Sequence, residues 1–359
     1  MSVELESVQR SSGALFAPFG SVRLPARFGD LHAEWTAVRR RCGLLDPRFR
    51  TLLRVVGADR VSFLQGMVSN DVAQLADGQG TYAALLTQQG KLVSDLRIYA
   101  LADELWLDVP EARAGAVREN LQRYIVADDV EFVDAVSWVP LVLVEGPLAA
   151  RTLVAVTGES LEDLQPFAHR EVGFDGTRVR VVSATHSGEN GYMLCGDGAV
   201  SGTLWDHCRA AGAEPVGMEA LNVLRVEAGI PWQGWDMDET TLVAEVGLEA
   251  AISYKKGCYL GQEVVERVAA RGQVHRKLVG VVCEGRVPPA PRAQLTHEGR
   301  EVGWVTTAVW SPAIEAVIAL GYLRRESWEP GTEVQVAVAD GYVAARVTSL
   351  PFYVRESPV

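Results

Sequence analysis

Residues 81–101 read TYAALLTQQGKLVSDLRIYAL. Two runs rich in apolar residues, 81–87 and 92–101, flank the turn sequence QQGK, in which Gly90 can supply the positive φ of a tight turn. This pattern predicts an antiparallel β-hairpin. The stretch therefore indicates a sheet in which neighbouring strands are antiparallel.

Helices and further strands are expected on both sides of this hairpin. Asp59 is placed to cap a helix over residues 60–66, and Pro110 is placed to open another helix that reaches about residue 125. The other strands of this part of the chain are expected at 51–56, 105–109 and 130–133. Together these elements predict an α+β unit.

A second α+β unit and then a β-barrel are expected further along the chain. Strands at 139–145, 177–183 and 191–195 alternate with helices at 147–156, 199–211 and 218–229. Near residues 276–355 the chain turns to short alternating strands broken by Gly and Pro, which is typical of a small barrel. Those strands are expected at 278–283, 301–307, 316–322, 333–339 and 342–349. We predict three domains, 10–138, 139–274 and 275–359, of which the first two are interwoven.

Composition excludes several classes of function. The formal charge is −12, from 34 Lys and Arg against 46 Asp and Glu. An acidic chain disfavours general nucleic-acid binding and peripheral membrane binding, because both need basic surface. The N-terminal sequence lacks the pattern of a signal peptide and no apolar run approaches the ~18 residues of a membrane span, so a cytoplasmic protein is expected. Five cysteines without metal-ligand spacing predict neither a disulfide framework nor a metal site.

Segment 251–277 departs from this acidic average. It carries six Lys and Arg against two Glu, and Cys258 lies within it, just before a helical pattern of valines. The helix N-terminus and the neighbouring Lys255 and Lys256 would favour a thiolate at Cys258, whereas a buried, inert cysteine is the alternative. The flanking glycines suggest a tight loop that presents Cys258 and Tyr259 outward.

The sequence signatures of several common enzyme classes are absent. There is no GxSxG, GxxxxGK[ST], HExxH or clean GxGxxG motif, so acyl hydrolysis, P-loop ATP use, zincin chemistry and dinucleotide binding lack support. The acidic cluster Asp236, Asp238 and Glu239 lacks the glycine and terminal glutamate of an EF-hand, so we expect a solvated turn there.

Two related families share motifs with this chain. KGCYLGQE at 256–263 matches the K-G-C-[FY]-x-G-Q-E signature in full, and FLQG at 63–66 precedes SNDV at 69–72. In these stretches the chain resembles the YgfZ-type folate-binding proteins, which assist the maturation of iron–sulfur enzymes. LRVEAGIP at 224–231 and DETT at 238–241 are similar to segments of the glycine-cleavage T proteins, which are tetrahydrofolate-dependent aminomethyltransferases. The chain is identified as a member of this superfamily.

The resemblance implies a fold and a cofactor. The fold is an α+β, glycine-cleavage T-protein-like ring of three subdomains around a central folate channel. Two of the subdomains are α+β ferredoxin-like units, and the third is the C-terminal β-barrel. The implied cofactor is tetrahydrofolate, and the basic segment 251–277 would suit the polyanionic tail of a polyglutamylated form.

The resemblance also implies the site residues. Glu227 is the expected folate contact, because the pterin carries N–H donors that suit a carboxylate. Tyr82 and Asp95 have the spacing of the folate-contacting tyrosine and the catalytic aspartate of T proteins. Strand-end aspartates also commonly cap turns, so this role of Asp95 has a structural alternative. The signature motif adds Cys258 as a catalytic group, with folate contacts expected at Lys256, Tyr259 and Gln262.

Two departures from the T-protein pattern favour the YgfZ-type interpretation. Cys258 stands where T proteins usually carry an acidic residue, and Gln233 stands where they carry a tyrosine. Our main hypothesis is a tetrahydrofolate-binding protein that supports assembly or repair of iron–sulfur enzymes, with client enzymes or assembly proteins as partners. One alternative is a folate-dependent aminomethyl or methyl transferase that uses Asp95 and Glu227. The other is a non-catalytic docking protein that uses the basic segment 251–277.

Overall fold

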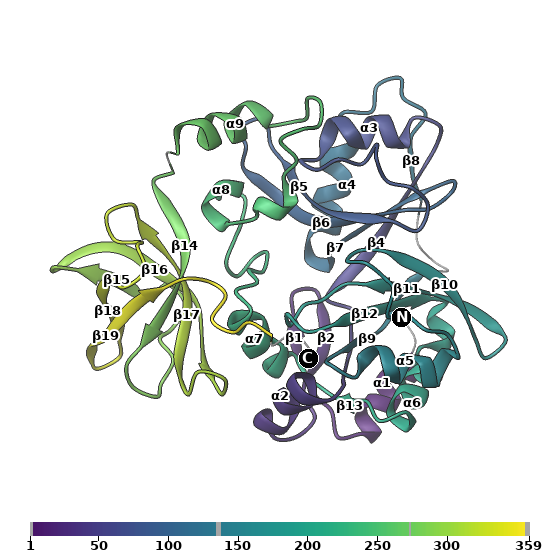
Figure 1. The fold of residues 1–359 in the computed structure, drawn as a ribbon, viewed down its shortest axis with the longest axis horizontal. Coiled ribbons are helices and arrows are strands. Elements are labelled where there is room, and N and C mark those ends of the chain that lie inside the picture. The colour runs from purple at the N-terminus through teal and green to yellow at the C-terminus, as the bar shows by residue number, and fades with distance from the viewer. Residues whose placement is uncertain (1–2, 134–137, 273, 356–359) are drawn as a thin grey trace. The chain divides into compact units, whose positions relative to one another are not determined.

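The computed structural model describes residues 3–133, 138–272 and 274–355 (Figure 1). Its chain divides into two compact units. The first unit comprises Met1–Leu86, Val93–Leu221 and Ala250–Leu260, and the second comprises Thr87–Leu92, Asn222–Glu249 and Gly261–Val359. The three predicted domain boundaries stay predictions. Within the described ranges, none of the helices combines the length and the apolar character that crossing a membrane requires.

The first unit contains a five-stranded sheet in the order β5-β6-β7-β4-β8, in which the predicted hairpin strands are neighbours. Gly90 has a φ of 71° in the hairpin turn, as expected. One face of the sheet is apolar, because alternate residues of a strand point to the same side. α3 and α4 cover that face, where Leu64 of α3 and Val117 of α4 share one core with Leu96 of β6. The elements are β4 (Arg50–Val56), α3 (Arg60–Met67), β5 (Gly80–Leu86), β6 (Leu92–Ala100), β7 (Leu105–Pro110), α4 (Ala114–Gln122) and β8 (Glu131–Val133).

α3 starts after Asp59, as predicted, but the side chain of Asp59 does not cap it. Asp59 makes no capping hydrogen bond to the helix. Its carboxylate instead accepts a hydrogen bond from the backbone N–H of Asp129 (2.9 Å), and the Asp129 carboxylate accepts one from the N–H of Ala58 (3.0 Å). The predicted N-cap position is therefore confirmed, whereas the side-chain capping bond is absent, because a partner distant in sequence takes up the carboxylate that local pattern assigns to the helix.

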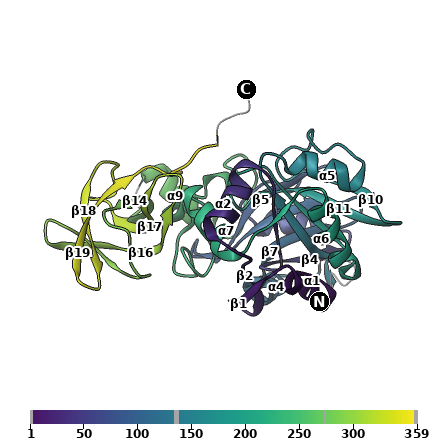
Figure 2. The ribbon, with the colours of Figure 1, turned by 90° about the horizontal axis from the view of Figure 1, so that it is seen from below.

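A second sheet in the first unit has the strand order β10-β11-β12-β9-β3-β13. α1, α5 and α6 pack on one face of it around Trp205 and Leu153 (Figure 2). β3 comes from the N-terminal part of the chain, so this sheet joins segments that are far apart in sequence. The elements are α1 (Val3–Ser11), β3 (Gly43–Leu45), β9 (Val139–Glu145), α5 (Ala149–Thr157), β10 (His169–Phe174), β11 (Thr177–Ser183), β12 (Gly191–Gly196), α6 (Ser201–Ala210) and β13 (Glu214–Pro215).

The elements of residues 15–40 have no counterpart in the sequence prediction. β1 (Leu15–Phe19) and β2 (Val22–Arg27) form a separate antiparallel pair. α2 (Leu31–Arg40) follows, and Asp30 caps it by accepting a hydrogen bond from the N–H of Ala33 (2.9 Å).

The second unit contains a closed six-stranded barrel in the order β14-β17-β16-β15-β18-β19, which confirms the predicted barrel. Closure of the sheet buries the inward side chains in one core, around Val281, Val305 and Leu323. β15, a strand of four residues, was not predicted. The strands are β14 (Arg276–Cys283), β15 (Gln294–His297), β16 (Arg300–Ser311), β17 (Ala316–Arg324), β18 (Glu333–Val338) and β19 (Gly341–Thr348). The helices that precede the barrel are α7 (Met218–Glu227), α8 (Val243–Val246) and α9 (Gln262–Arg271).

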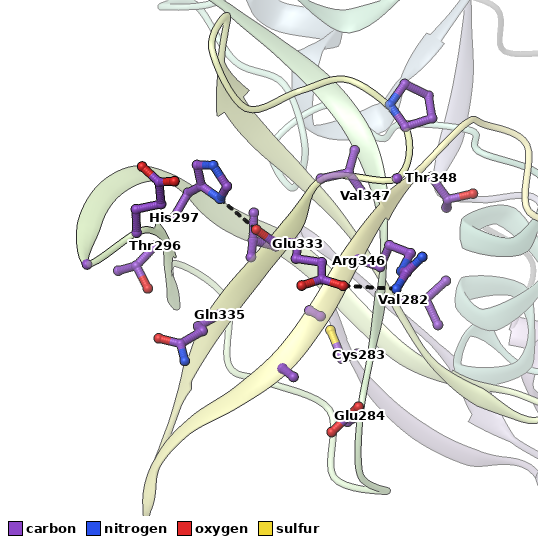
Figure 3. Close-up of a pocket in the computed structure, with 17 residues that line it drawn as sticks. Val282, Cys283, Glu284, Thr296, His297, Glu333, Gln335, Arg346, Val347 and Thr348 are labelled. Atoms are coloured by element: carbon purple, nitrogen blue, oxygen red, sulfur yellow. Dashed lines mark hydrogen bonds and ion pairs between the residues drawn. The ribbon is translucent and has the colours of Figure 1, made fainter.

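An open groove of about 1140 Å³ lies on the barrel, along β14, β18 and β19. Two of its polar side chains have partners within the groove: Arg346 Nη2 lies 3.1 Å from Glu333 Oε1, and His297 Nδ1 lies 2.7 Å from the backbone carbonyl oxygen of Glu333 (Figure 3). Burial raises the pKa of the lining Cys283 to about 12, so its thiol stays protonated at neutral pH. The described residues that line the groove include none of the predicted site residues.

Candidate functional site

Tyr82 and Asp95, which the sequence pairs by their spacing, lie side by side in the first unit. Tyr82 is on β5 and Asp95 on the neighbouring β6, and the Tyr82 hydroxyl donates a hydrogen bond to Asp95 Oδ2 at 3.2 Å. Burial, and then the Asp95 carboxylate, raise the pKa of Tyr82 well above its usual value, so the hydroxyl is a permanent donor at neutral pH. The half-buried ring of Phe167 stacks on Tyr82 with a centroid distance of 6.2 Å.

Phe167 is a site residue that the sequence analysis missed. Its φ is +64°, a conformation that is rare for an aromatic residue and persists only where the surroundings fix it. Its backbone N–H donates to the carbonyl of Ser183 (2.8 Å), which holds the loop before β10 in place. Backbone strain of this kind leaves no signal in local sequence pattern.

Arg50 on β4 is the second missed residue. Its Nη1 lies 3.6 Å from Asp95 Oδ2, and its Nε donates to Asp108 Oδ1 at 2.7 Å. The Asp108 carboxylate on β7 is fully buried and also accepts a hydrogen bond from the Tyr99 hydroxyl at 3.1 Å. A buried cation thus joins two carboxylates on one face of the first sheet.

Strand alternation is the signal that could have found this cluster. On β6, Asp95, Arg97 and Tyr99 alternate with the core residues Leu96 and Ile98, so the polar side chains share the face opposite the helices. All of β6 is nevertheless buried. A strand whose charged face is also buried needs a charged partner on each neighbouring strand.

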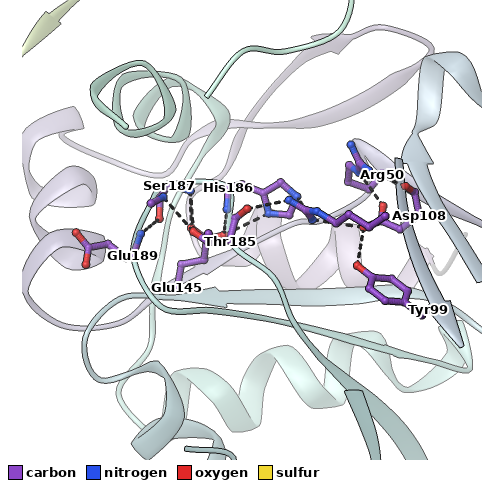
Figure 4. Close-up of polar contacts among 10 residues, drawn as sticks. Arg50, Tyr99, Asp108, Glu145, Thr185, His186, Ser187 and Glu189 are labelled. Atoms are coloured by element: carbon purple, nitrogen blue, oxygen red, sulfur yellow. Dashed lines mark hydrogen bonds and ion pairs between the residues drawn. The ribbon is translucent and has the colours of Figure 1, made fainter. Parts of the chain in front are cut away.

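The polar cluster continues from the first sheet into the second (Figure 4). Arg97 Nη1 lies 3.4 Å from Asp108 Oδ2 and 2.8 Å from His186 Nε2, and Arg97 Nη2 donates to the carbonyl of Thr185 at 2.8 Å. Because an arginine can only donate, His186 Nε2 must be the acceptor, and His186 is the neutral tautomer with its proton on Nδ1. Burial, and then Arg97 and Arg50, hold the pKa of His186 well below 6.5, in agreement with this assignment.

Glu145, at the end of β9, closes the cluster on the other side of His186. Its Oε1 accepts the backbone N–H of His186 (2.7 Å) and lies 3.3 Å from His186 Nδ1, while its Oε2 accepts the N–H of Ser187 (2.9 Å). Its side chain is fully buried. Burial outweighs these hydrogen bonds and raises the pKa of Glu145 to about 7.

This raised pKa predicts a pH dependence of stability. The folded chain keeps the Glu145 proton up to about pH 7, whereas the unfolded chain releases it near 4.5. The free energy of unfolding should therefore fall by about 3 kcal/mol from this group as the pH rises from 4.5 to 7. Urea denaturation of wild type and Glu145→Gln across this range should show a weaker fall in the variant. Glu159→Gln, at an exposed glutamate of the same unit, is the control, and equal slopes for wild type and Glu145→Gln would contradict the prediction.

Lys256, an expected folate contact, has a structural role in the first unit. Its ammonium donates to three backbone carbonyls, those of Gln65 (2.6 Å), Val68 (2.7 Å) and Asn70 (2.8 Å). Burial lowers the pKa of Lys256 to about 8. Because its three N–H groups are all engaged, Lys256 fixes the signature loop, which carries the KGCYLGQE motif, to the end of α3. Contact of Lys256 with folate stays a prediction.

The signature loop presents only one of its two expected residues outward. Cys258 is exposed, whereas Tyr259 is 7% exposed and its ring lies 5.2 Å from Lys256 Nζ. The expectation that the loop displays both side chains is wrong for Tyr259, because its ring packs in the interior beside the buried ammonium. An exposed Cys258 contradicts the alternative of a buried, inert cysteine. Catalysis by Cys258 stays a prediction.

Gln262 and Glu227, both expected folate contacts, belong to the second unit. Gln262 begins α9, and its Nε2 donates to Glu266 Oε1 at 2.6 Å. Glu227 ends α7 and is fully buried: its Oε1 accepts the Ser311 hydroxyl at 2.5 Å and the N–H of Ala313 at 3.3 Å. These bonds anchor α7 to the β16–β17 turn of the barrel, and folate binding by either residue stays a prediction.

Asp236 is not part of a solvated turn. It is 2% exposed, pairs with the buried Arg225, and accepts hydrogen bonds from the hydroxyls of Thr306 (2.6 Å) and Thr307 (2.7 Å). That expectation is therefore wrong for Asp236, because the barrel supplies partners from about 70 residues further along the chain. Within the described part of the chain, no cluster of three His, Cys, Asp or Glu could hold a metal ion.

Known proteins match this chain along nearly its full length. Residues 5–256 match the GCVT N-terminal domain and residues 276–353 match the Glycine cleavage T-protein C-terminal barrel domain. The chain is 31% identical over 366 residues to an aminomethyltransferase of Prochlorococcus marinus (strain MIT 9313), with 98% of each chain covered. It is 32% identical over 356 residues to that of Pelodictyon phaeoclathratiforme (strain DSM 5477 / BU-1), with 97% of each covered. The crystal structure of glycine cleavage system aminomethyltransferase T from Bartonella henselae is similar with a TM-score of 0.91 at 25% identity, covering 99% of this chain and 98% of that one.

Proposed function

The chain belongs to the glycine-cleavage T-protein family, and from this premise we propose that it is a folate-dependent aminomethyltransferase. In the proposed reaction, the methylene carbon of an aminomethyl group on a lipoyl-bound donor passes to tetrahydrofolate. Methylenetetrahydrofolate and ammonia are the products, and the donor sulfur leaves as a thiol. The sequence motifs favoured a role in the assembly or repair of iron–sulfur enzymes. The relatives named above are aminomethyltransferases and favour the transferase function instead. The expected fold class, two α+β sheets followed by a β-barrel, is confirmed.

The observation that carries the proposal is the Asp95 carboxylate held against Tyr82. An amine that leaves or attacks must exchange protons, and a positioned carboxylate can orient that amine or accept its proton. The residues also suit a folate, because the stacked rings of Tyr82 and Phe167 offer aromatic surface to a flat heterocycle. Tetrahydrofolate, when bound, would supply the two nitrogens that receive the carbon.

The direct test is an assay with an aminomethyl-lipoyl donor protein and tetrahydrofolate. Formation of methylenetetrahydrofolate, followed with a coupled dehydrogenase, is the expected result. A folded wild-type protein that binds tetrahydrofolate and yields no methylenetetrahydrofolate would overturn the proposal.

One observation favours a second candidate function, in which the protein supports assembly or repair of iron–sulfur enzymes. Cys258 lies in the full KGCYLGQE match and its side chain is exposed, so a partner can reach the thiol. Client enzymes or assembly proteins would be the partners in this case. A single thiolate is too few ligands for a stable cluster, so it would act by transient ligation or a redox step.

Cys258→Ala separates the two functions. We expect the variant to keep aminomethyl transfer within about twofold of wild type, because no bond of the proposed reaction uses a protein thiol. Cys283→Ala, at a buried cysteine of the barrel, is the matched control for loss of a thiol. Lower iron–sulfur enzyme activity in cells that carry only Cys258→Ala, with transferase activity retained, would favour the second function. Loss of the transferase activity would contradict our expectation.

The polyglutamylated form of the folate also stays a proposal. Two of the basic residues of segment 251–277 are engaged within their own units, Lys256 by three carbonyls and Arg276 by Glu245 at 3.1 Å. Lys255 and Lys277 are exposed. These exposed cations support attraction of an anionic tail, or of an acidic partner, at low ionic strength.

A further inference from the structure

We propose that Arg50 is a positioning residue for Asp95, with Asp108 as its anchor. The inference rests on the proposed function, because Asp95 is the reacting carboxylate there. Arg50 on β4 is buried and makes its closest contacts with Asp108, so its role is to fix where the Asp95 carboxylate points.

The geometry of the guanidinium supports this role. Nε donates to Asp108 Oδ1 at 2.7 Å and Nη2 donates to the Asp108 carbonyl at 2.7 Å. Two bonds to one residue fix the plane of the group, and therefore the position of the remaining Nη1, which faces Asp95 Oδ2 at 3.6 Å. A lysine at position 50 could supply the positive charge, but it lacks the planar group whose several N–H donors have fixed relative directions.

The contacts of Asp95 leave one oxygen for the reaction. The Tyr82 hydroxyl donates a hydrogen bond to Oδ2, and Arg50 Nη1 forms an ion pair with the same oxygen. Among the described residues, Oδ1 has no hydrogen-bond partner, and the residue retains 8% exposure. With Oδ2 fixed on two sides, Oδ1 is the atom that can meet the substrate amine.

Asp108 is itself fixed by three side chains from the two neighbouring strands β4 and β6. Besides Arg50 on β4, it accepts a hydrogen bond from Tyr99 on β6, at 3.1 Å, and it lies 3.4 Å from Arg97 on the same strand. Arg97 is held in turn by His186 and the Thr185 carbonyl in the loop between β11 and β12 of the second sheet. The orientation of Asp95 thus depends on a buried cluster that links both sheets of the first unit.

A double-mutant cycle tests the role. Arg50→Lys keeps the charge and should lower kcat of aminomethyl transfer by about 10- to 100-fold, because a displaced catalytic group loses alignment. KM for tetrahydrofolate should stay within about twofold, because Arg50 is buried and its side chain is engaged by Asp108 and Asp95. In an Asp95→Asn background, Arg50→Lys should change the residual rate by less than about twofold, since the group it positions is gone.

Arg54→Lys is the matched control. Arg54 lies on the same face of β4 and pairs with Glu104 (Nε to Oε2, 2.7 Å), a partner separate from Asp95 and Asp108. The Arg54→Lys variant should keep kcat within about twofold of wild type. Two outcomes would overturn the positioning role while the wild type remains active. One is that Arg50→Lys lowers kcat by the same factor in the wild type and in Asp95→Asn, and the other is that Arg50→Lys and Arg54→Lys lower kcat equally. An inactive wild type would overturn both this role and the proposed function.

Discussion

Asp95→Asn is expected to lower kcat for methylenetetrahydrofolate formation by about 10²- to 10⁴-fold, the usual contribution of a positioned acid or base. Asparagine has nearly the same shape and can still accept the hydrogen bond from Tyr82, so the fold should persist. It cannot take up a proton at neutral pH, and its amide is a poor partner for the Arg50 guanidinium. Single-turnover rates with saturating tetrahydrofolate would measure the chemical step directly.

The control for this variant is Asp103→Asn. Asp103 is an exposed aspartate in the turn between β6 and β7 of the same sheet, so its loss should leave kcat within about twofold. A fall for Asp95→Asn of less than about threefold, in protein whose thermal unfolding matches wild type, would leave Asp95 only a structural role, as a partner of Tyr82 and Arg50 inside β6.

The second large effect concerns stability, and it lies in the second unit. Arg225→Met should lower the free energy of unfolding by about 3–5 kcal/mol, because it leaves the Asp236 carboxylate buried without its cation. Both side chains are completely buried. The hydroxyls of Thr306 and Thr307 remain as hydrogen-bond donors in the variant, but neither carries a charge. Urea denaturation can follow this loss through tryptophan fluorescence, because Trp232 lies 4.9 Å from the Arg225 guanidinium.

An exposed ion pair of the same unit provides the comparison. Arg346 pairs with Glu333 on the barrel at 3.1 Å, with side-chain exposures of 65% and 80%. Arg346→Met should change the free energy of unfolding by no more than about 0.5 kcal/mol, because water screens such pairs. If Arg225→Met cost less than about 1 kcal/mol, the Arg225–Asp236 pair would not be the anchor that its burial indicates.

Much of the fold could be predicted from local pattern. The strand at 139–145 and the strand at 177–183 coincide with β9 and β11, and the five expected barrel strands correspond to β14, β16, β17, β18 and β19. Period-two alternation and turn glycines act over a few residues, so they can be read directly. The elements of residues 15–40 were missed, and the side-chain cap at Asp59 was wrong because a distant backbone N–H competes for the same carboxylate.

Only part of the candidate site could be predicted from the sequence. Tyr82 and Asp95 could be paired because a hairpin places residues of known spacing on adjacent strands. The contact between Arg50 and Asp108 could not be predicted in this way, because the two residues lie 58 positions apart and meet only through the strand order β6-β7-β4. Phe167 comes from the second α+β segment, and only folding places its ring on Tyr82.

The amino-acid sequence by itself determined the element types, the succession of α+β segments and barrel, and the family motifs, because these depend on short-range periodicity and on unbroken runs of residues. The tertiary structure decided what the charged side chains do. Lys256 finds its three carbonyls 186 to 191 residues away, and Glu227 finds Ser311 at a separation of 84. A buried charge is stable only with a partner, and the partner is chosen by the packing of distant segments.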